Sequence, residues 1–283
     1  MIDLYCITHK KLTCHHDALQ IIGVGGVSGD GFNYLDSEGE NISHLNECFS
    51  ELTGHYFVWK NLLADSNAVG FCHYRRFLVP SAAKQWLLSS SSQSFDNRAS
   101  GGEGNYASGY LLETGLEQEL LGTPSYLSEL QSDLKNVDIL LPKRNLLTED
   151  SFLGQYSRCH PSKPFFMMLT EIAKMDTELA NRAFYFYTHT HYAYWNNLFI
   201  TKSETFNQYC NFLFDILIPL EKVLEKYPQQ YQNRVCAFLS ERLLNFWVFE
   251  NNLLIKEIDW CVTSEILDEP ADHQIAIPGL EET

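Results

Sequence analysis

The sequence predicts an α/β fold, with a mixed, mainly parallel sheet flanked by helices in a Rossmann-like arrangement. Short apolar runs alternate with segments of helical period along most of the 283 residues. Hydrophobic residues make up 45% of the chain and aromatic residues 13%, which is enough for a substantial core. Basic residues follow three of the apolar runs directly, at the edge where such sheets bind ligands.

The apolar runs predict strands, and the periodic segments predict helices. Strands are expected at residues 2–8, 19–26, 68–74 and 137–142. Helices are expected at residues 44–63, 125–136, 164–184 and 234–252, where apolar side chains recur every three or four residues. Residues 192–227 are expected to pass from a strand or turn into a long helix that Pro219 kinks or divides.

These elements predict a single domain over residues 1–260. Residues 89–109 are rich in Ser and Gly and almost devoid of aliphatic side chains, so they are expected to form a mobile loop. Residues 261–283 are expected to form an acidic, loosely held tail.

The charge of the chain excludes several classes of partner. There are 36 acidic and 20 basic residues, a formal net charge of −16, whereas nucleic acid and anionic lipid both require a basic surface. The first residues lack the features of a signal peptide, and no run approaches the roughly 18 apolar residues of a membrane span. We expect a cytoplasmic protein, at most peripherally bound to the inner face of the membrane, whose eight scattered cysteines stay reduced.

The basic residues that follow three predicted strands indicate an anion site. They occur in the stretches "HKK", "HYRR" and "PKRN", and are His9, Lys10, His73, Arg75, Arg76, Lys143 and Arg144. The alternative for each residue is an ion pair with a nearby carboxylate. Continued strand alternation would place His73 and Arg75 on one face and Tyr74 and Arg76 on the other.

The known phosphate and metal motifs are missing from the sequence. It contains no phosphate-binding P-loop, no HExxH and no GxSxG, and "GVGGVSG" matches the dinucleotide fingerprint only loosely. No acidic Asp-x-Asp pair stands at a strand end to hold a divalent metal. Guanidinium groups bind phosphate oxygens without a metal, so a nucleotide-sugar diphosphate fits the basic cluster.

Several stretches resemble a known family. "ENISHLNECFSELTGHYFVWKN", "VGFCHYRRFLVP", "DILLPKR" and "RVCAFLSERLLNFW" occur in the order seen in the DUF4422 family of bacterial capsule and O-antigen gene clusters. The resemblance covers most of residues 2–250, with a variable insertion near residues 85–120. Members of the family are regarded as glycosyltransferases.

The resemblance implies a transfer reaction and its substrates. It implies that a hexose, such as galactose or galactofuranose, moves from a UDP-sugar to a surface-polysaccharide acceptor, which can be lipid-linked. A fold-level analogy to GT-A transferases would put "HYRR" where those enzymes carry their metal-binding Asp-x-Asp, so no metal or other cofactor is expected.

Roles can be assigned to candidate residues on this basis. The catalytic candidates are Glu51, Glu241 and His73, of which a carboxylate would take the proton of an acceptor hydroxyl. The donor candidates are Thr8, His9, Lys10, Gly25, Gly26, His73, Tyr74, Arg75, Arg76 and Lys143. The acceptor candidates are Trp195, Asn196, Asn197 and His191.

Other interpretations remain open for the same residues. Glu241 could instead form an internal ion pair with an arginine, and His55 could point at the site with Glu51 or lie on a solvated helix face. Asn41 could cap a helix, Trp59 is expected in the core, and Asp36, Glu38 and Glu40 are alternative bases. The whole chain could be a non-catalytic carbohydrate- or anion-binding module, or a phosphate-ester hydrolase with His73 as nucleophile.

Overall fold

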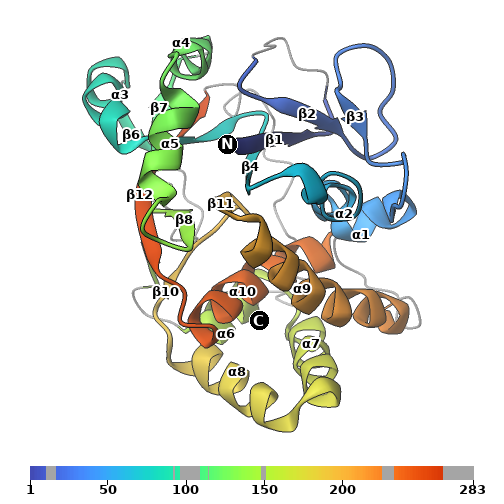
Figure 1. The fold of residues 1–283 in the computed structure, drawn as a ribbon. Coiled ribbons are helices and arrows are strands. Elements are labelled where there is room, and N and C mark those ends of the chain that lie inside the picture. Colours follow the sequence, from blue (N-terminus) through green and yellow to red (C-terminus); the bar gives the residue numbers. More distant parts are fainter. Residues whose placement is uncertain are drawn as a thin grey trace, which may run out of the picture.

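One sheet organises the chain, in a computed structural model that describes residues 1–10, 17–91, 93–95, 109–113, 115–147, 151–224 and 233–263. Its strands follow the order β3–β2–β1–β4–β11–β8–β12–β7–β6, and β5 pairs with both β4 and β12 (Figure 1). Strands β9 and β10 form a second, two-stranded sheet. The strand bounds are β1 Ile2–Thr8, β2 Gln20–Gly23, β3 Tyr34–Leu35, β4 Ala68–His73, β5 Arg76–Val79, β6 Gln93–Phe95, β7 Gly109–Leu112, β8 Ile139–Pro142, β9 Asn145–Leu146, β10 Tyr192–Ala193, β11 Phe199–Lys202 and β12 Ile255–Thr263.

The sheet is mixed, as predicted, but less parallel than expected. Strands β1, β2, β3 and β4 are parallel neighbours, and β12 is parallel to β7 and β8. Strands β11 and β5 each run antiparallel to both of their neighbours. Strand β5 was not predicted, whereas β11 lies where the sequence left a strand or turn open before the long helix. The carboxyl ends of β1, β4 and β8 still meet at one edge, as the sequence suggested.

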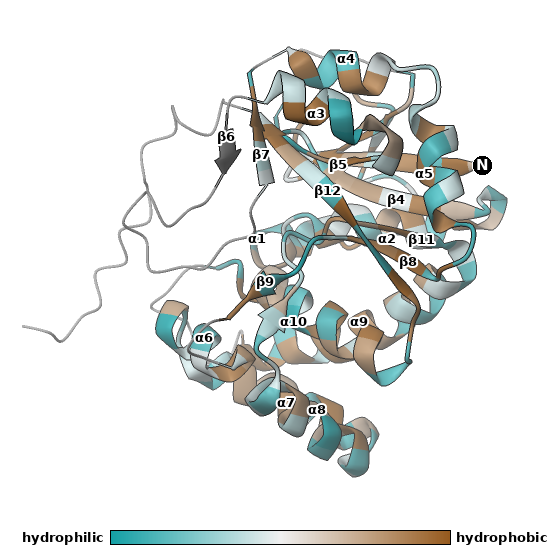
Figure 2. Cartoon of the chain, turned by 90° about the vertical axis from the view of Figure 1, so that its left-hand side faces the viewer, coloured by the Kyte–Doolittle hydropathy of each residue, from teal (hydrophilic) through white to brown (hydrophobic). Residues whose placement is uncertain are grey.

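Helices cover both faces of the sheet. They are α1 Asn46–Phe49, α2 Leu52–Asn61, α3 Lys84–Ser90, α4 Leu116–Gly122, α5 Tyr126–Leu134, α6 Phe152–Cys159, α7 Ser162–Met175, α8 Thr177–His189, α9 Ser203–Leu224 and α10 Val235–Glu250. Figure 2 shows α3, α4 and α5 on one side of the sheet and α7 to α10 on the other. Each side has its own hydrophobic core.

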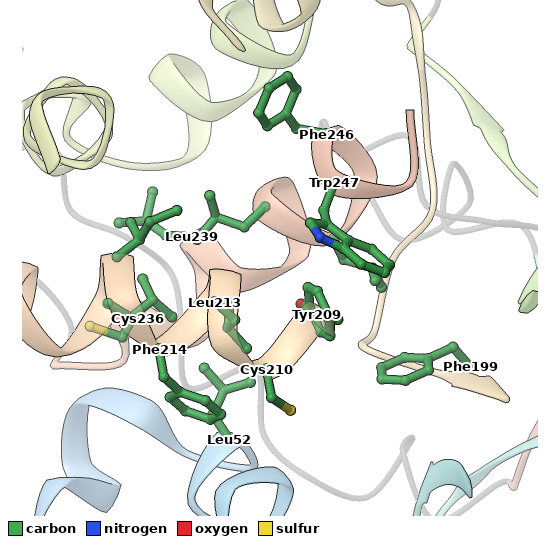
Figure 3. Packing of buried hydrophobic residues seen from close by; sticks show 14 of the residues in the cluster. Leu52, Phe199, Tyr209, Cys210, Leu213, Phe214, Cys236, Leu239, Phe246 and Trp247 are labelled. Carbon is green, nitrogen blue, oxygen red and sulfur yellow. The ribbon is translucent and has the colours of Figure 1, made fainter. Parts of the chain in front are cut away.

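The pleat of β1 divides its side chains between these two cores. Tyr5 and Ile7 pack into the larger core, whereas Leu4 and Cys6 pack into the smaller one. The larger core includes side chains of α2, α9, α10 and β11, which meet in Figure 3. This packing holds α10 against the sheet. The first turn of α10 lies near the carboxyl ends of β1 and β4.

The predicted helix at residues 44–63 is broken in two. Ser50 ends α1 with a left-handed backbone (φ 48°), and α2 begins two residues later at Leu52. Ser50 and Glu51 therefore lie at a break between two helices at the edge of the sheet, rather than within one continuous helix.

The later helices also differ from the prediction. Residues 164–184 span two helices, because Asp176 interrupts the segment and caps α8 by accepting hydrogen bonds from the amides of Glu178 and Leu179. Pro219, in contrast, lies inside α9 without dividing it, since the helix runs from Ser203 to Leu224. The prediction that Pro219 divides this helix is wrong.

The longest strand, β12, was not predicted from the sequence. It pairs with β8 through Ile255–Ile258 and with β5 through Asp259–Val262. It extends to Thr263, which is three residues beyond the boundary set for the domain. The rest of the expected tail, residues 264–283, lies outside the described residues, as does most of the expected loop at 89–109.

Two sequence expectations concern membranes and cysteines. Within the described residues, no helix is both long and apolar enough to cross a bilayer. The cysteines that the structure describes, which exclude Cys14, are all free thiols. Cys48 and Cys236 come closest to each other, with their Sγ atoms 3.1 Å apart between α1 and α10.

His55 belongs to the larger core rather than to the site or to a solvated surface. Its side chain packs on Phe71, with ring centroids 4.2 Å apart, and also contacts Phe199 and Phe206. Burial lowers the pKa of His55 from 6.5 to about 3. Both interpretations of this residue from the sequence were therefore wrong.

The core makes a direct prediction for Phe71. This ring is fully buried and contacts Tyr5, His55, Phe199 and Phe206. Phe71→Ala should lower the free energy of unfolding by about 3–5 kcal/mol in urea titrations, because it leaves a cavity. The same substitution at Phe166, which is 47% exposed, should change it by less than about 0.5 kcal/mol. Equal effects at the two positions would contradict the core described here.

A second prediction concerns pH. Between pH 6.5 and about 3, the unfolded chain binds a proton at His55 that the folded chain does not bind. The free energy of unfolding should therefore fall by up to about 1.4 kcal/mol for each pH unit of acidification through this range. His55→Leu should remove that contribution, so urea titrations at several pH values should give a shallower dependence than for the wild type. An unchanged dependence would show that His55 is not buried in its neutral form.

Candidate functional site

A cavity of about 680 Å³ opens at the carboxyl edge of β1 and β4. One wall comes from the ends of these strands and the start of β5, and the opposite wall from α1, α6 and α10. The loop between β10 and β11 closes the space between the walls through Trp195 and Asn196. This is the edge at which ligands bind in open α/β sheets.

The "HYRR" segment forms a tight hairpin on the strand wall. His73 is the last residue of β4, Tyr74 and Arg75 form the turn, and Arg76 begins β5 and pairs with His73. We call residues 73–76 the cationic hairpin. All four side chains line the cavity, so the predicted split between two faces of one continuous strand was wrong.

Basic and aromatic groups gather around the ring of Tyr74. The Arg75 guanidinium lies 5.2 Å from the ring centroid, and the Lys10 ammonium lies 5.5 Å from it. The His9 ring meets Tyr74 edge-on, with centroids 5.7 Å apart. Tyr74 therefore joins the basic end of β1 to the hairpin. Thr8 also lines the cavity, and its hydroxyl closes a turn with the backbone of Lys10.

Arg76 also lines the cavity and is half-buried. Burial and the charge of Arg75 lower the pKa of its guanidinium, while Glu241 and Glu51 act in the opposite direction. Within the described part of the chain, no hydrogen bond or ion pair engages Arg76. A half-buried guanidinium of this kind is suited to bind an anion that enters the cavity.

His73 is held by the loop across the cavity. Its Nε2 atom lies 2.8 Å from the carbonyl oxygen of Asn196. Because a carbonyl oxygen can only accept a hydrogen bond, Nε2 carries the proton in this arrangement. Burial lowers the pKa of His73, although the carboxylate of Glu51 opposes the shift.

Two mostly buried carboxylates face the cavity in different environments. Although burial raises the pKa of Glu51, the charges of His73 and Arg234 and a hydrogen bond from Asn197 lower it below its usual value. Burial raises the pKa of Glu241, and the nearby charge of Glu51 adds to this effect. Nearby carboxylates whose pKa values are pushed apart are typical of sites that accept and release protons.

Glu241 is also more fully hydrogen-bonded than Glu51. Glu241 accepts hydrogen bonds at both oxygens, from the backbone amide of Asn196 at 2.7 Å and from Arg242 at 3.0 Å. Glu51 accepts a hydrogen bond from the side-chain amide of Asn197, at 2.9 Å. Its other oxygen lies 3.8 Å from the Arg234 guanidinium. The Glu241–Arg242 pair is the internal ion pair considered from the sequence.

Aromatic side chains line the helix wall. Phe238 and His160 stack with their ring centroids 4.4 Å apart, and both face the cavity half-buried. Trp195 is almost fully buried, and Arg242 covers its ring at 4.6 Å. Burial and the charge of Arg242 lower the pKa of His160 to about 3, so this ring is neutral at physiological pH.

Other predicted site residues do not line the cavity. Lys143 and Arg144, at the end of β8, pair with Asp259 and Glu257 on β12, as the ion-pair interpretation allowed. The carbonyl oxygen of His191 accepts a hydrogen bond from the Leu147 amide next to the small sheet. The carboxylates at 36, 38 and 40, and the residues Gly25, Gly26, Asn41, Trp59 and Asn197, also lie outside its lining.

Some of these residues have clear structural roles. Gly25 has a left-handed backbone (φ 73°), and a Cβ atom there would come within 3.0 Å of the Asn46 side chain. Asn41 accepts hydrogen bonds from the amide and hydroxyl of Ser43, as in a capping turn. The carboxylate of Asp36 is buried and accepts a hydrogen bond from Thr53.

The cavity also contains residues that the sequence reasoning missed. They are Asn46, Glu47, Ser50, Gln155, His160 and Phe238. Most lie near helix ends, where a helical pattern gives no sign of which side chains face a cavity. The polar stretch "NECFSE" within an otherwise apolar helix pattern was the available signal for the first three. Among the described residues, no group of three His, Cys, Asp or Glu side chains is arranged to hold a metal ion.

Comparisons with known proteins identify the fold and the family. The apo structure of the bifunctional glycosyltransferase WbbM superposes with a TM-score of 0.73 at 23% sequence identity. The match covers 93% of this chain and 45% of the WbbM chain, so this chain spans less than half the length of that protein. No curated protein sequence matches significantly. The model of the domain of unknown function DUF4422 matches residues 3–252, and the chain therefore belongs to the DUF4422 family.

Proposed function

We propose that this chain is a glycosyltransferase that binds the diphosphate of a nucleotide sugar at the cationic hairpin and passes the sugar to an acceptor hydroxyl. One observation carries the proposal: two guanidinium groups and a mostly buried carboxylate with a lowered pKa share one cavity. The guanidiniums suit a diphosphate leaving group, and the carboxylate suits deprotonation of an acceptor. The likeness to a solved glycosyltransferase fold supports this assignment.

The donor half of the reaction rests on Arg75 and Arg76. Negative charge grows on the diphosphate as the bond to the sugar breaks, and fixed cations stabilise that charge most where water is excluded. In many transferases a divalent metal has this role, but here the hairpin supplies the cations, so we expect no dependence on added metal. The parallel β3–β2–β1–β4 arrangement next to the antiparallel β11 supports a GT-A-like fold. As the resemblance implies, the donor we propose is a UDP-hexose.

Glu51 is the better candidate for the base. One of its oxygens lies 3.8 Å from the Arg234 guanidinium, beyond hydrogen-bond distance, whereas both oxygens of Glu241 accept hydrogen bonds. Glu51 would take the proton of the acceptor hydroxyl while the hydroxyl oxygen bonds to the anomeric carbon and the diphosphate leaves. A lowered pKa keeps this carboxylate ionised at neutral pH.

The acceptor would enter along the helix wall, opposite the hairpin. There, Phe238 and His160 offer apolar surface to a sugar ring. Trp195 and Asn197, the earlier candidates, are less suitable because both are almost fully buried. We propose a sugar hydroxyl of a surface polysaccharide as the acceptor, following the family resemblance.

Arg76→Ala should weaken binding of UDP about 10- to 100-fold, because a charge-assisted contact in a half-buried site is lost. Titration calorimetry with UDP, in the presence of manganese and in the presence of EDTA, measures this directly. The wild type should bind equally well in both conditions. Arg182→Ala removes an exposed arginine that pairs with Glu250, and should leave the affinity unchanged.

Two results would argue against this assignment. If the wild type binds no nucleoside diphosphate or nucleotide sugar in either condition, the donor site is wrong. If it binds UDP but turns over no UDP-sugar with any glycan acceptor, a non-catalytic binding module becomes the better description.

Glu51→Gln should lower kcat about 10²- to 10⁴-fold and leave UDP affinity within about twofold, because the amide cannot accept the proton but keeps the shape. The wild-type rate should fall only when the pH drops below 4.5, the usual value for this carboxyl, since the pKa of Glu51 is lowered. Steady-state kinetics over pH, at pH values where the protein stays folded, test both points. Glu241→Gln is the matched variant, and a larger loss of kcat there would move the base to Glu241.

A further inference from the structure

The loop between β10 and β11 contains two consecutive residues with left-handed backbones. Asn196 has a φ of 76° and Asn197 a φ of 47°. Among residues other than glycine, asparagine tolerates this conformation best, but two in succession are unusual and depend on the surroundings that hold them in place. Strain of this kind is common at functional sites, so the groups that hold this turn are informative.

The contacts of the turn lead to the three candidate catalytic side chains. Asn196 uses its backbone: its amide donates to Glu241 at 2.7 Å, and its carbonyl accepts from His73 at 2.8 Å. Asn197 uses its side chain: its amide nitrogen donates to Glu51 and to Ser240, both at 2.9 Å. One dipeptide therefore binds residues from β4, from the start of α2 and from α10.

The two carboxylates receive one hydrogen bond each from the turn, but they differ in their second oxygen. Arg242 occupies the second oxygen of Glu241, at 3.0 Å. The second oxygen of Glu51 lies 3.8 Å from the Arg234 guanidinium, beyond hydrogen-bond distance. The turn thus fixes the orientation of Glu51 through one oxygen and leaves the other oxygen facing the cavity.

We propose that Asn196 and Asn197 are positioning residues, which aim Glu51 as the proton acceptor and hold Glu241 and His73 in fixed hydrogen-bonding states. The inference rests on the proposed transfer reaction. It adds that the turn at Asn196 and Asn197 makes Glu51, and not Glu241, the catalytic base. It replaces the expectation that the two asparagine amides bind the acceptor sugar. Asn197 is 2% exposed, and its amide nitrogen is already engaged by Glu51 and Ser240.

Positions 196 and 197 restrict the amino acid in different ways. Position 196 contributes only backbone groups to these contacts, so it needs a residue that tolerates a left-handed backbone, such as Asn or Gly. Position 197 needs both that backbone and a side-chain donor for Glu51. An aspartate at 197 would keep the size of the side chain but face the Glu51 carboxylate with a second negative charge.

The experiment compares Asn196→Gly with Asn196→Ala, and Asn197→Ala with Asn197→Asp. We expect kcat to fall less than about threefold in Asn196→Gly and tenfold or more in Asn196→Ala, because alanine resists the left-handed backbone. In both Asn197 variants kcat should fall while the KM for the UDP-sugar stays within twofold. The acid limb of their pH profile should move to higher pH, and further in Asn197→Asp, since Glu51 loses a donor that favours its ionised form.

A measurement that does not depend on turnover separates this inference from the proposed function. Carbon-13 NMR of the Glu51 carboxyl should show it titrating at higher pH in Asn197→Ala than in the wild type. Nitrogen-15 NMR of His73 should show the proton on Nε2 in the wild type. If no acceptor supports turnover, the proposed function fails, but these titrations still test the role of the turn.

Clear results would overturn the inference. An Asn197→Ala variant with the wild-type pH profile and the wild-type Glu51 titration would show that the turn does not control this carboxylate. Equal loss of kcat in Asn196→Gly and Asn196→Ala would show that the Asn196 side chain, not its backbone, matters. If the Asn197 variants fail to fold, Ser240→Ala replaces them: it releases the other partner of the Asn197 amide, and an unchanged Glu51 titration there counts against the proposal.

Discussion

The geometry of the cavity depends on the cations and hydrogen-bond donors that compensate two mostly buried carboxylates. A buried carboxylate costs several kcal/mol unless cations and hydrogen-bond donors surround it. Glu51 and Glu241 obtain these donors from the β10–β11 loop and from the arginines at 234 and 242 of the α10 region. The elements that line the cavity are therefore linked by charge as well as by apolar packing. Removing one donor would leave a charge without its partner, so their positions depend on one another.

The sheet supplies the opposite charge at the same place. Parallel pairing of β1 and β4 brings their carboxyl ends together, and the reversal into β5 returns Arg76 to the same edge. The outcome is a cavity with cations on the strand wall and carboxylates from helical segments facing them, in a chain of net charge −16. A local cation cluster in such an acidic chain can attract a small anion without giving the whole surface affinity for nucleic acid.

Local sequence patterns identified the parts of this structure that depend on neighbouring residues. The sequence showed the strands at residues 2–8 and 68–74 and the basic residues after them, because an apolar run changes abruptly to polar and basic residues there. The pairing of β12 with β5 and of β11 with β4 and β8 was not evident, because these partners lie far apart in the sequence. The hairpin was missed because Tyr74 and Arg75 are not typical turn residues. Phe238 and His160 were missed because aromatic residues on helices usually indicate core.

The last described strand has a consequence for the order in which the molecule assembles. The amide of Thr263 donates a hydrogen bond to the carbonyl of Arg75, and Val262 pairs with Arg76, so the hairpin is braced by residues almost 190 positions later in the chain. On the ribosome, β1 and β4 can pair early, but the hairpin stays without this brace until β12 has emerged. A nascent chain would therefore acquire its anion-binding geometry only after residue 263 has emerged from the ribosome. The ability to bind ligand would then indicate that β12 has paired with β5 and that the sheet is complete at this point.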